Sequence, residues 1–249
     1  ILILVAFLYT SRAVNKSIEL ENRFTQTEKL AYVGEMASGL AHEIRNPLNA
    51  MALNIQLLNE ECEKKVDEKS LIKMKKIHQE IFHLEKILTD FLDFSKPVKL
   101  EKESTDIKDL VFEVVDLLKP EMEKKTIDIS LEHEKSLPLI NVDRNKIKQA
   151  LFNLIINAIQ AIPQERGKII IKITNQSKKI YLNIIDNGCG MSEDIQKKIF
   201  TLFYSAKEGG TGIGLPIVQK ILREHNGEIS VKSKPGEGST FTMIFPVES

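Results

Sequence analysis

The sequence has no tryptophan, few cysteines and no excess of charge of either sign. Its 249 residues include only two cysteines, Cys62 and Cys189, which lack the spacing of metal ligands. A disulfide framework is therefore not expected, and both residues are interpreted as free thiols in a reducing compartment. The 35 basic residues cancel the 35 acidic ones, and no basic run is interleaved with aromatic residues. A nucleic-acid partner is not expected either.

The apolar run that opens the chain, ILILVAFLY, is too short to cross a membrane. A helix of that length rises about 14 Å, whereas the hydrocarbon core of a bilayer is about 30 Å thick. Arg12 and Lys16 follow the run, as is typical where a transmembrane helix emerges on the cytoplasmic side. We therefore expect residues 1–19 to be the end of a transmembrane helix and a juxtamembrane linker. The alternative is the hydrophobic end of a core helix.

Two seams of apolar residues with helical spacing follow. The first contains Leu30, Val33, Ala37, Leu40, Ile44, Leu48, Met51, Ile55 and Leu58. The second contains Leu71, Met74, Ile77, Ile81, Leu84, Leu88 and Phe91. Spacings of three and four residues predict two helices that pack together as an antiparallel hairpin. The segment between them, NEECEKKVDEKS, has no Gly or Pro, so one continuous helix is the alternative.

After Pro97 the pattern changes to short strands that alternate with helices, and VKLEKESTD has the composition of a linker. The predicted strands are residues 126–133, 167–174, 178–186, 227–233 and 238–246. The predicted helices are residues 106–123, 143–161 and 215–225. These elements predict a second domain, an α+β sandwich in which helices cover one mixed sheet.

The segment GLAHEIRNPLNAM, residues 39–51, carries the first candidate site. On a helix, His42 lies nearly opposite the apolar seam, and Asn46 lies one turn further along the same face. Pro47 leaves the carbonyl of Glu43 without its helical hydrogen bond and predicts a bend there. An exposed histidine beside a carboxylate and a bend indicates a reactive site on a mobile helix. A solvated surface histidine is the alternative.

Two asparagines mark the second candidate site. In QALFNLIINAIQAI, residues 149–162, Asn153 and Asn157 fall four positions apart on one face of an otherwise apolar helix. Amide oxygens are hard ligands that suit Mg²⁺, which takes its other ligands from water and phosphate. The alternative is a pair of amides that bond the backbone.

Two glycine-containing loops complete the candidates. In IIDNGCGM, Asp186 ends a strand and could bond a base, while Gly188 and Gly190 allow close approach of the backbone. In KEGGTGIGLP, four glycines precede Pro216 and offer backbone N–H groups and a helix N-terminus to an anion such as a triphosphate. A tight turn and a flexible linker are the respective alternatives. The second loop matches neither the dinucleotide fingerprint nor the Walker P-loop.

Together, the segments HEIRNPL, NLIINAIQA, DNGCGM and IFTLFYSAKEGGTGIGL resemble the sensor histidine kinases of two-component systems. They are similar, in this order, to the phosphoacceptor box, the asparagine box, the first glycine box, and the phenylalanine box with the ATP lid and second glycine box. The resemblance extends from about residue 20 to residue 249. HEIRNPL together with a short lid before GTGIGL is most similar to the nitrogen-regulator type.

The resemblance implies two domains and their partners. Residues 20–96 are expected to form the dimerisation and histidine phosphotransfer domain, an antiparallel hairpin that makes a four-helix bundle in a homodimer. Residues 97–104 are expected to be a linker, and residues 105–249 a Bergerat-type α/β sandwich that binds ATP. The full-length protein is expected in the bacterial inner membrane, with this region on the cytoplasmic side.

The resemblance also implies a reaction for the helical segment. The Nε2 atom of His42 attacks the γ-phosphate of ATP while Glu43 takes the Nδ1 proton. The phosphoryl group then passes to an aspartate in the receiver domain of a response regulator. Asn46 is expected to hold a water for dephosphorylation of that partner.

In the ATP-binding domain, Asn157 is expected to bind Mg²⁺, Asn153 to assist at the phosphates and Asp186 to accept the adenine amino group. The other residues expected at the nucleotide are Gly188, Gly190, Lys207, Gly210, Thr211, Gly212, Gly214 and Leu215. Two positions depart from the family pattern, since Gln160 replaces a frequent basic residue and Ala206 a frequent threonine.

Two other functions remain open from the sequence. One is a Bergerat-fold ATPase of the gyrase or chaperone kind, which releases free phosphate, but such proteins have no HEIRNPL on a preceding helix. The other is a degenerate sensor that acts only as a binding scaffold. The intact Asn157, Asp186 and glycine loops argue against that interpretation.

Overall fold

The computed structural model describes residues 48–49, 51–55, 68–95, 100–163, 166–207 and 210–247. Residues 1–19, His42, Glu43, Asn46 and Cys62 lie outside the described residues. In the part of the chain that is described, no helix is both long enough and apolar enough to cross a membrane. The chain divides into two compact units, residues 1–98 and 99–249, and each is described by itself.

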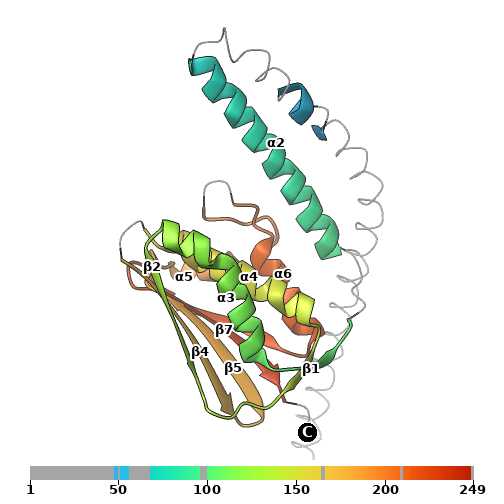
Figure 1. Ribbon diagram of the computed structural model, residues 1–249, viewed down its shortest axis with the longest axis vertical. Helices are drawn as coiled ribbons and strands as arrows, with labels where there is room; N and C mark the ends of the chain where they lie inside the picture. Colours follow the sequence, from blue (N-terminus) through green and yellow to red (C-terminus); the bar gives the residue numbers. More distant parts are fainter. Residues whose placement is uncertain are drawn as a thin grey trace, which may run out of the picture. The chain divides into compact units, whose positions relative to one another are not determined.

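The first unit contains helix α2, Glu68–Ser95, and a shorter helical stretch that includes residues 51–55 (Figure 1). Leu48 and Ile55 from the first seam are buried with Ile81 of α2 in one apolar cluster. Residues of the two predicted seams therefore pack together.

Not every residue of the second seam is buried in the single chain. Ile77 is 51% exposed and Leu84 is 49% exposed, and Phe82, which lies outside the predicted seam, is 68% exposed. Helix α2 thus presents large apolar side chains on more than one face.

The second unit is built on a five-stranded sheet with the order β2-β4-β5-β7-β6. Its strands are β2 Ile127–His133, β4 Gly167–Gln176, β5 Lys179–Asp186, β6 Glu228–Lys234 and β7 Gly238–Pro246. Strands β2 and β4 are parallel, and the other neighbouring pairs are antiparallel. The prediction of one mixed sheet is therefore confirmed.

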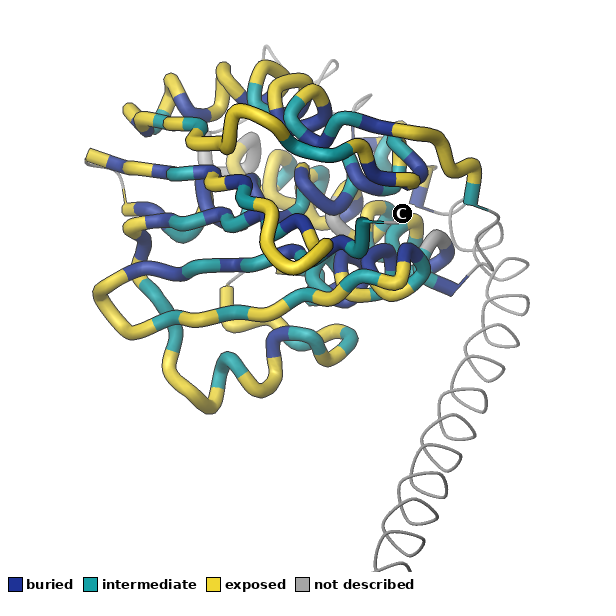
Figure 2. Tube along the Cα trace, turned by 90° about the horizontal axis from the view of Figure 1, so that it is seen from below, coloured by how far each residue is buried: buried dark blue, intermediate teal, exposed yellow. Residues whose placement is uncertain are grey.

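Three helices pack on this sheet, and they are α3 Ile107–Lys124, α4 Arg144–Ala161 and α6 Gly214–Glu224. Side chains of β4 alternate, because Ile169, Ile171 and Ile173 are fully buried whereas Lys168 and Lys172 are exposed. The core therefore lies between the helices and one face of the sheet, as the colouring of Figure 2 shows. The predicted α+β sandwich is confirmed.

Three short elements differ from the sequence-based expectation. Strand β1, Glu103–Thr105, pairs antiparallel with β3, Ile140–Val142, and helix α5 covers Glu193–Lys198. The expected linker, residues 97–104, therefore overlaps β1, and Glu103 and Ser104 belong to a strand. A strand of three residues contains too few alternations to be recognised, because its pairing depends on a partner that is distant in sequence.

Candidate functional site

Helix α4 carries the two predicted asparagines at the edge of its buried face. The Asp143 side chain caps the helix by accepting from the Lys146 N–H at 3.1 Å. Asn153 and Asn157 are half-buried. The Nδ2 atom of Asn153 donates to the Gly214 carbonyl at 3.4 Å, which joins α4 to the first residue of α6. The amide nitrogen of Asn153 therefore bonds the backbone, as the alternative to a metal-binding role expects.

Asp186 ends strand β5 and is only 4% exposed. Its Oδ1 atom accepts from the Gly188 N–H at 2.8 Å. Burial raises the pKa of this carboxyl group, although the backbone N–H groups of Gly188 and Ser239 act in the opposite direction. A buried acceptor therefore stands at the end of the sheet, beside the loop that follows β5.

The loop after β5 lies against the last turn of α4. The Cys189 N–H donates to the Ala161 carbonyl at 3.0 Å, and a Cβ atom on Gly188 would lie 2.7 Å from the same oxygen. Gly190 has φ +66°, and a Cβ atom there would lie 1.9 Å from the Lys234 carbonyl oxygen. Both glycines are therefore required by close backbone packing, Gly188 against the end of α4 and Gly190 against Lys234.

The second glycine loop leads directly into α6. Gly212 has φ +68°, and its carbonyl accepts from the Phe203 N–H at 3.0 Å, which closes the loop on itself. The Thr211 hydroxyl accepts from the Ile213 N–H at 3.4 Å. Helix α6 begins at Gly214, and no side chain caps it. The N–H groups of its first turn therefore face the loop without helical partners, and Pro216 in that turn has no N–H to satisfy.

Lys207 connects the glycine loop to the carboxyl end of α4. Its Nζ atom donates to the Asn157 carbonyl at 3.2 Å and lies 3.4 Å from the Gln160 Oε1 atom. Although much of the side chain is exposed, partial desolvation of the ammonium lowers its pKa. The Asp186 carboxylate raises the same pKa, so the loop cation lies within electrostatic reach of that buried group.

Two known families match this chain in sequence. Residues 32–98 match the His Kinase A (phospho-acceptor) domain, and residues 142–249 match the histidine kinase-, DNA gyrase B-, and HSP90-like ATPases. The solved catalytic domain of histidine kinase ThkA is 32% identical, and the match covers 59% of this chain and 96% of that chain with a TM-score of 0.55. The chain belongs to the sensor histidine kinases.

Other relatives extend the similarity beyond the ATP-binding domain. The signal transduction histidine-protein kinase AtoS of Escherichia coli (strain K12) is 38% identical over 92% of this chain. The chain spans only 37% of the length of AtoS. ThkA in complex with the response regulator protein TrrA is 31% identical with a TM-score of 0.66, over 89% of this chain and 64% of that chain. Full-length ShkA in complex with AMPPNP is 25% identical with a TM-score of 0.71, over 86% of this chain and 46% of that chain.

In this histidine kinase, the predicted residues of the ATP-binding domain gather where α4, β5 and α6 meet. Asn153 contacts Gly214, Lys207 contacts the backbone of Asn157, and the loop after Asp186 contacts α4. Gly210 and Leu215 flank the same loop and helix start, although residues 208–209 lie outside the described residues. His42, Glu43 and Asn46 are not described, so their arrangement stays a prediction.

One cation near this histidine kinase's glycine loop could not be predicted from the sequence. The Nζ atom of Lys125, just after α3, donates to the Ile159 carbonyl at 3.0 Å, and its charge lowers the pKa of Lys207. A lysine after a helix is usually solvated, so the position of Lys125 near the glycine loop is seen only once α3 is packed beside α4. Lys125 and Lys207 thus bring two positive charges to the end of α4, where Gln160 replaces a basic residue of the family.

Proposed function

We propose that this chain is the ATP-binding and phosphotransfer region of a sensor kinase that phosphorylates itself on His42 and passes the phosphoryl group to a response regulator. The observation that carries the proposal is the convergence of the α4 asparagines, Asp186 and the Lys207 loop at one end of the ATP-binding domain. Both family matches, and the order in which they occur along the chain, support it.

Adenine binds at Asp186. The backbone N–H groups of Gly188 and Ser239 bond the Asp186 carboxylate, and an ionised carboxylate has about four acceptor positions. A remaining position accepts the amino group of adenine. Gly188 keeps the backbone close to α4 and Gly190 keeps it close to Lys234, so that the base can approach the carboxylate without a side chain in the way.

The triphosphate binds at the glycine loop and the start of α6. The free N–H groups of the first helical turn and the partial positive charge of a helix N-terminus favour an anion there. Lys207 adds a full charge, and Asn153 holds Gly214 in place from α4. Gly210, Thr211, Gly212 and Leu215 supply the backbone around the phosphates.

The side-chain oxygen of Asn157 fits a Mg²⁺ ion that takes its other ligands from phosphate and water. Among the described residues, no three His, Cys, Asp or Glu side chains form a metal-binding group. One amide on a half-buried helix edge agrees with the small number of protein ligands that Mg²⁺ takes. When bound, the ion neutralises phosphate charge.

His42 accepts the phosphoryl group. Its Nε2 atom forms a bond to the γ-phosphorus as the bond to the bridging oxygen breaks and ADP leaves, and Glu43 accepts the Nδ1 proton. An aspartate carboxylate of the receiver domain then takes the phosphoryl group from His42. Asn46, one helical turn from His42, holds a water for hydrolysis of the resulting aspartyl phosphate.

Two copies of the chain associate through the helical unit. The exposed apolar side chains Ile77, Phe82 and Leu84 on α2 support this dimer, because apolar surface of this kind is usually covered by a partner. The apolar run ILILVAFLY, followed by Arg12 and Lys16, supports attachment to the inner membrane with this region on its cytoplasmic side.

The decisive experiment is incubation of the chain with γ-labelled ATP and Mg²⁺. A phosphohistidine keeps the label at alkaline pH and loses it in acid. We expect retained label with this stability, and loss of the label in His42→Gln but not in His133→Gln, which changes an exposed histidine of β2. Rapid release of free phosphate without labelled protein would instead identify an ATPase of the gyrase or chaperone kind.

A further inference from the structure

His225, at the end of α6, is a buried histidine with both ring nitrogens hydrogen-bonded. It is 4% exposed. Its Nδ1 atom lies 2.7 Å from the Ile221 carbonyl oxygen, and its Nε2 atom lies 3.0 Å from the Asp143 main-chain nitrogen. A main-chain N–H can only donate, so Nε2 is the acceptor and Nδ1 carries the hydrogen. The ring is therefore neutral and joins the end of α6 to the start of α4.

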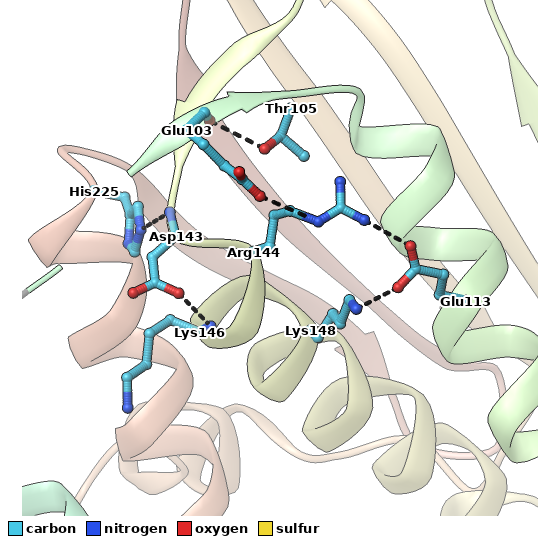
Figure 3. A network of polar contacts seen from close by, with 8 residues as sticks. All are labelled: Glu103, Thr105, Glu113, Asp143, Arg144, Lys146, Lys148 and His225. Atoms are coloured by element: carbon cyan, nitrogen blue, oxygen red, sulfur yellow. Dashed lines mark hydrogen bonds and ion pairs between the residues drawn. The ribbon is translucent and has the colours of Figure 1, made fainter. Parts of the chain in front are cut away.

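Asp143 uses its main-chain and side-chain atoms in the same network (Figure 3). Besides the N–H that bonds His225, its Oδ1 atom accepts from the Lys146 N–H and its Oδ2 atom accepts from the Glu101 N–H at 3.1 Å. Glu101 lies in the chain that enters this unit, just before β1. Asp143 thus connects that chain, the first turn of α4 and, through its own N–H, the end of α6.

A second hydrogen bond joins α4 and α6 at the other end of α6. Asn153 contacts the Gly214 carbonyl, so Asp143 pairs with the end of α6 and Asn153 with its start. Ten residues separate the two positions on α4 and eleven separate them on α6. At 1.5 Å per residue, these lengths are about 15 Å and 16.5 Å. Two contacts with matching separations fix the antiparallel register of α4 and α6.

This register bears on the candidate site, because α4 carries Asn153 and Asn157 and α6 presents its N-terminus to the same place. We propose that His225 is a positioning residue for nucleotide binding, which acts through Asp143 to hold α6 in register with α4. The inference rests on the nucleotide-binding role proposed above. Loss of the His225 contact removes the hydrogen bond that holds the end of α6 to the start of α4, and small displacements of binding groups weaken a site strongly.

The test compares AMPPNP affinity, measured well below the melting temperature of every variant. We expect His225→Phe to weaken binding about fivefold or more, which is the lower range for coupling between distant sites. His133→Phe removes an exposed histidine of β2 and is expected to leave affinity unchanged. His225→Gln retains an acceptor and a donor, and we expect it to recover most of the lost affinity.

The outcomes separate this inference from the function on which it rests. If the unchanged chain does not bind AMPPNP, the proposed function fails, and the inference fails with it. If the unchanged chain binds and folded His225→Phe binds equally well, only the inference is overturned. A lower melting temperature of His225→Phe with unchanged AMPPNP affinity would also overturn the inference, because His225 would then contribute only to the stability of the fold.

A second variant tests the same network if His225→Phe does not fold. Glu101→Pro removes the N–H that Asp143 Oδ2 accepts, whereas Glu101→Ala keeps it. We expect the proline variant to bind AMPPNP at least about twofold more weakly than the alanine variant. The effect is smaller than that of His225→Phe, because only one of the hydrogen bonds to Asp143 is lost. Equal affinities of the two variants would overturn the inference.

Discussion

The ammonium nitrogen of Lys207 lies 3.2 Å from the main-chain oxygen of Asn157. A cation from the glycine loop therefore contacts the helix that carries the proposed magnesium ligand, although the two residues lie fifty positions apart in the sequence. Both of its hydrogen-bond acceptors, the Asn157 carbonyl and the Gln160 amide oxygen, are neutral groups. A phosphate is a stronger acceptor for an ammonium group than either of them, because its oxygens carry negative charge.

The first prediction follows from this contact. Lys207→Met is expected to weaken AMPPNP binding about tenfold, because a charged hydrogen bond contributes about 1.5–3 kcal/mol and about 1.4 kcal/mol corresponds to a factor of ten. Lys197→Met is the matched control, since it removes an exposed lysine in the last turn of α5. Titration calorimetry measures both affinities. Equal affinities for the two variants would place the phosphates away from Lys207.

The second prediction separates the nucleophile from the nucleotide site. His42→Gln is expected to bind AMPPNP with unchanged affinity and to lose the acid-labile label from γ-labelled ATP entirely, because His42 belongs to the helical unit and not to the ATP-binding domain. Filter binding and gel autoradiography measure the two quantities. Label that persists on the variant would mean that another side chain accepts the phosphoryl group.

The third prediction concerns the metal. Asn157→Ala is expected to weaken Mg²⁺-dependent AMPPNP binding about tenfold or more, because alanine offers no oxygen to the metal. Binding in EDTA is expected to change much less. Asn145→Ala removes an exposed asparagine from the first turn of the same helix and serves as the control. An equal loss with and without Mg²⁺ would make Asn157 a structural residue.

The long elements of the ATP-binding domain could be predicted because each carries its own periodic pattern. In β4, the apolar residues Ile169, Ile171 and Ile173 recur at every second position and are fully buried, whereas Lys168 and Lys172 are exposed and Ile170 is half-buried. Strand β1 could not be predicted, because Glu103–Thr105 is a strand only through its pairing with β3. Its buried residue, Thr105, is polar, so no hydrophobic signal accompanies it.

The same distinction applies to the site. Asp186 and Gly190 could be predicted because an acid followed by glycines at the end of a strand is a local signal. The contacts of Lys125 and His225 depend on which helices pack side by side, and the sequence around them resembles an ordinary helix end. The two hydrogen bonds of His225 form only because α6 ends beside Asp143, which the local sequence does not indicate.

The fourth prediction is a pH dependence of stability. Burial lowers the pKa of His225, and the nearby Lys102 lowers it further, whereas the Ile221 carbonyl and Asp143 raise it. A histidine whose pKa is lower in the folded protein than in the unfolded chain stabilises the fold above the unfolded value of about 6.5. This stabilisation is lost as the pH falls through the lower folded value, because a protonated Nε2 cannot accept from the Asp143 N–H.

Comparison with a variant isolates this histidine from the buried carboxyl groups of Asp186 and Glu224, whose pKa values burial raises. His225→Phe leaves the Asp143 N–H without its acceptor, which is expected to cost about 1–3 kcal/mol of unfolding free energy at pH 8. Urea denaturation at pH 8 and pH 5 measures the difference from the unchanged chain. The difference is expected to shrink at pH 5, and a constant difference would mean that folding does not lower the pKa of His225.

The fifth prediction concerns removal of the phosphoryl group from the response regulator, and it rests on the four-residue spacing of His42 and Asn46, which predicts that they lie one turn apart on a helix. An amide at that position can hold a water in line with the phosphorus of the partner's aspartyl phosphate, so that positioning supplies the rate. Autophosphorylation depends instead on His42, Glu43 and the ATP-binding domain. Asn46→Ala is therefore expected to reduce phosphatase activity about tenfold or more and autophosphorylation by less than about twofold.

Asn49→Ala, which changes an exposed asparagine further along the chain, is the control. Release of phosphate from the phosphorylated regulator and labelling by γ-labelled ATP measure the two activities. Equal losses in both, with AMPPNP binding intact, would mean that Asn46 supports the shape of the helix around Pro47 and does not position a water.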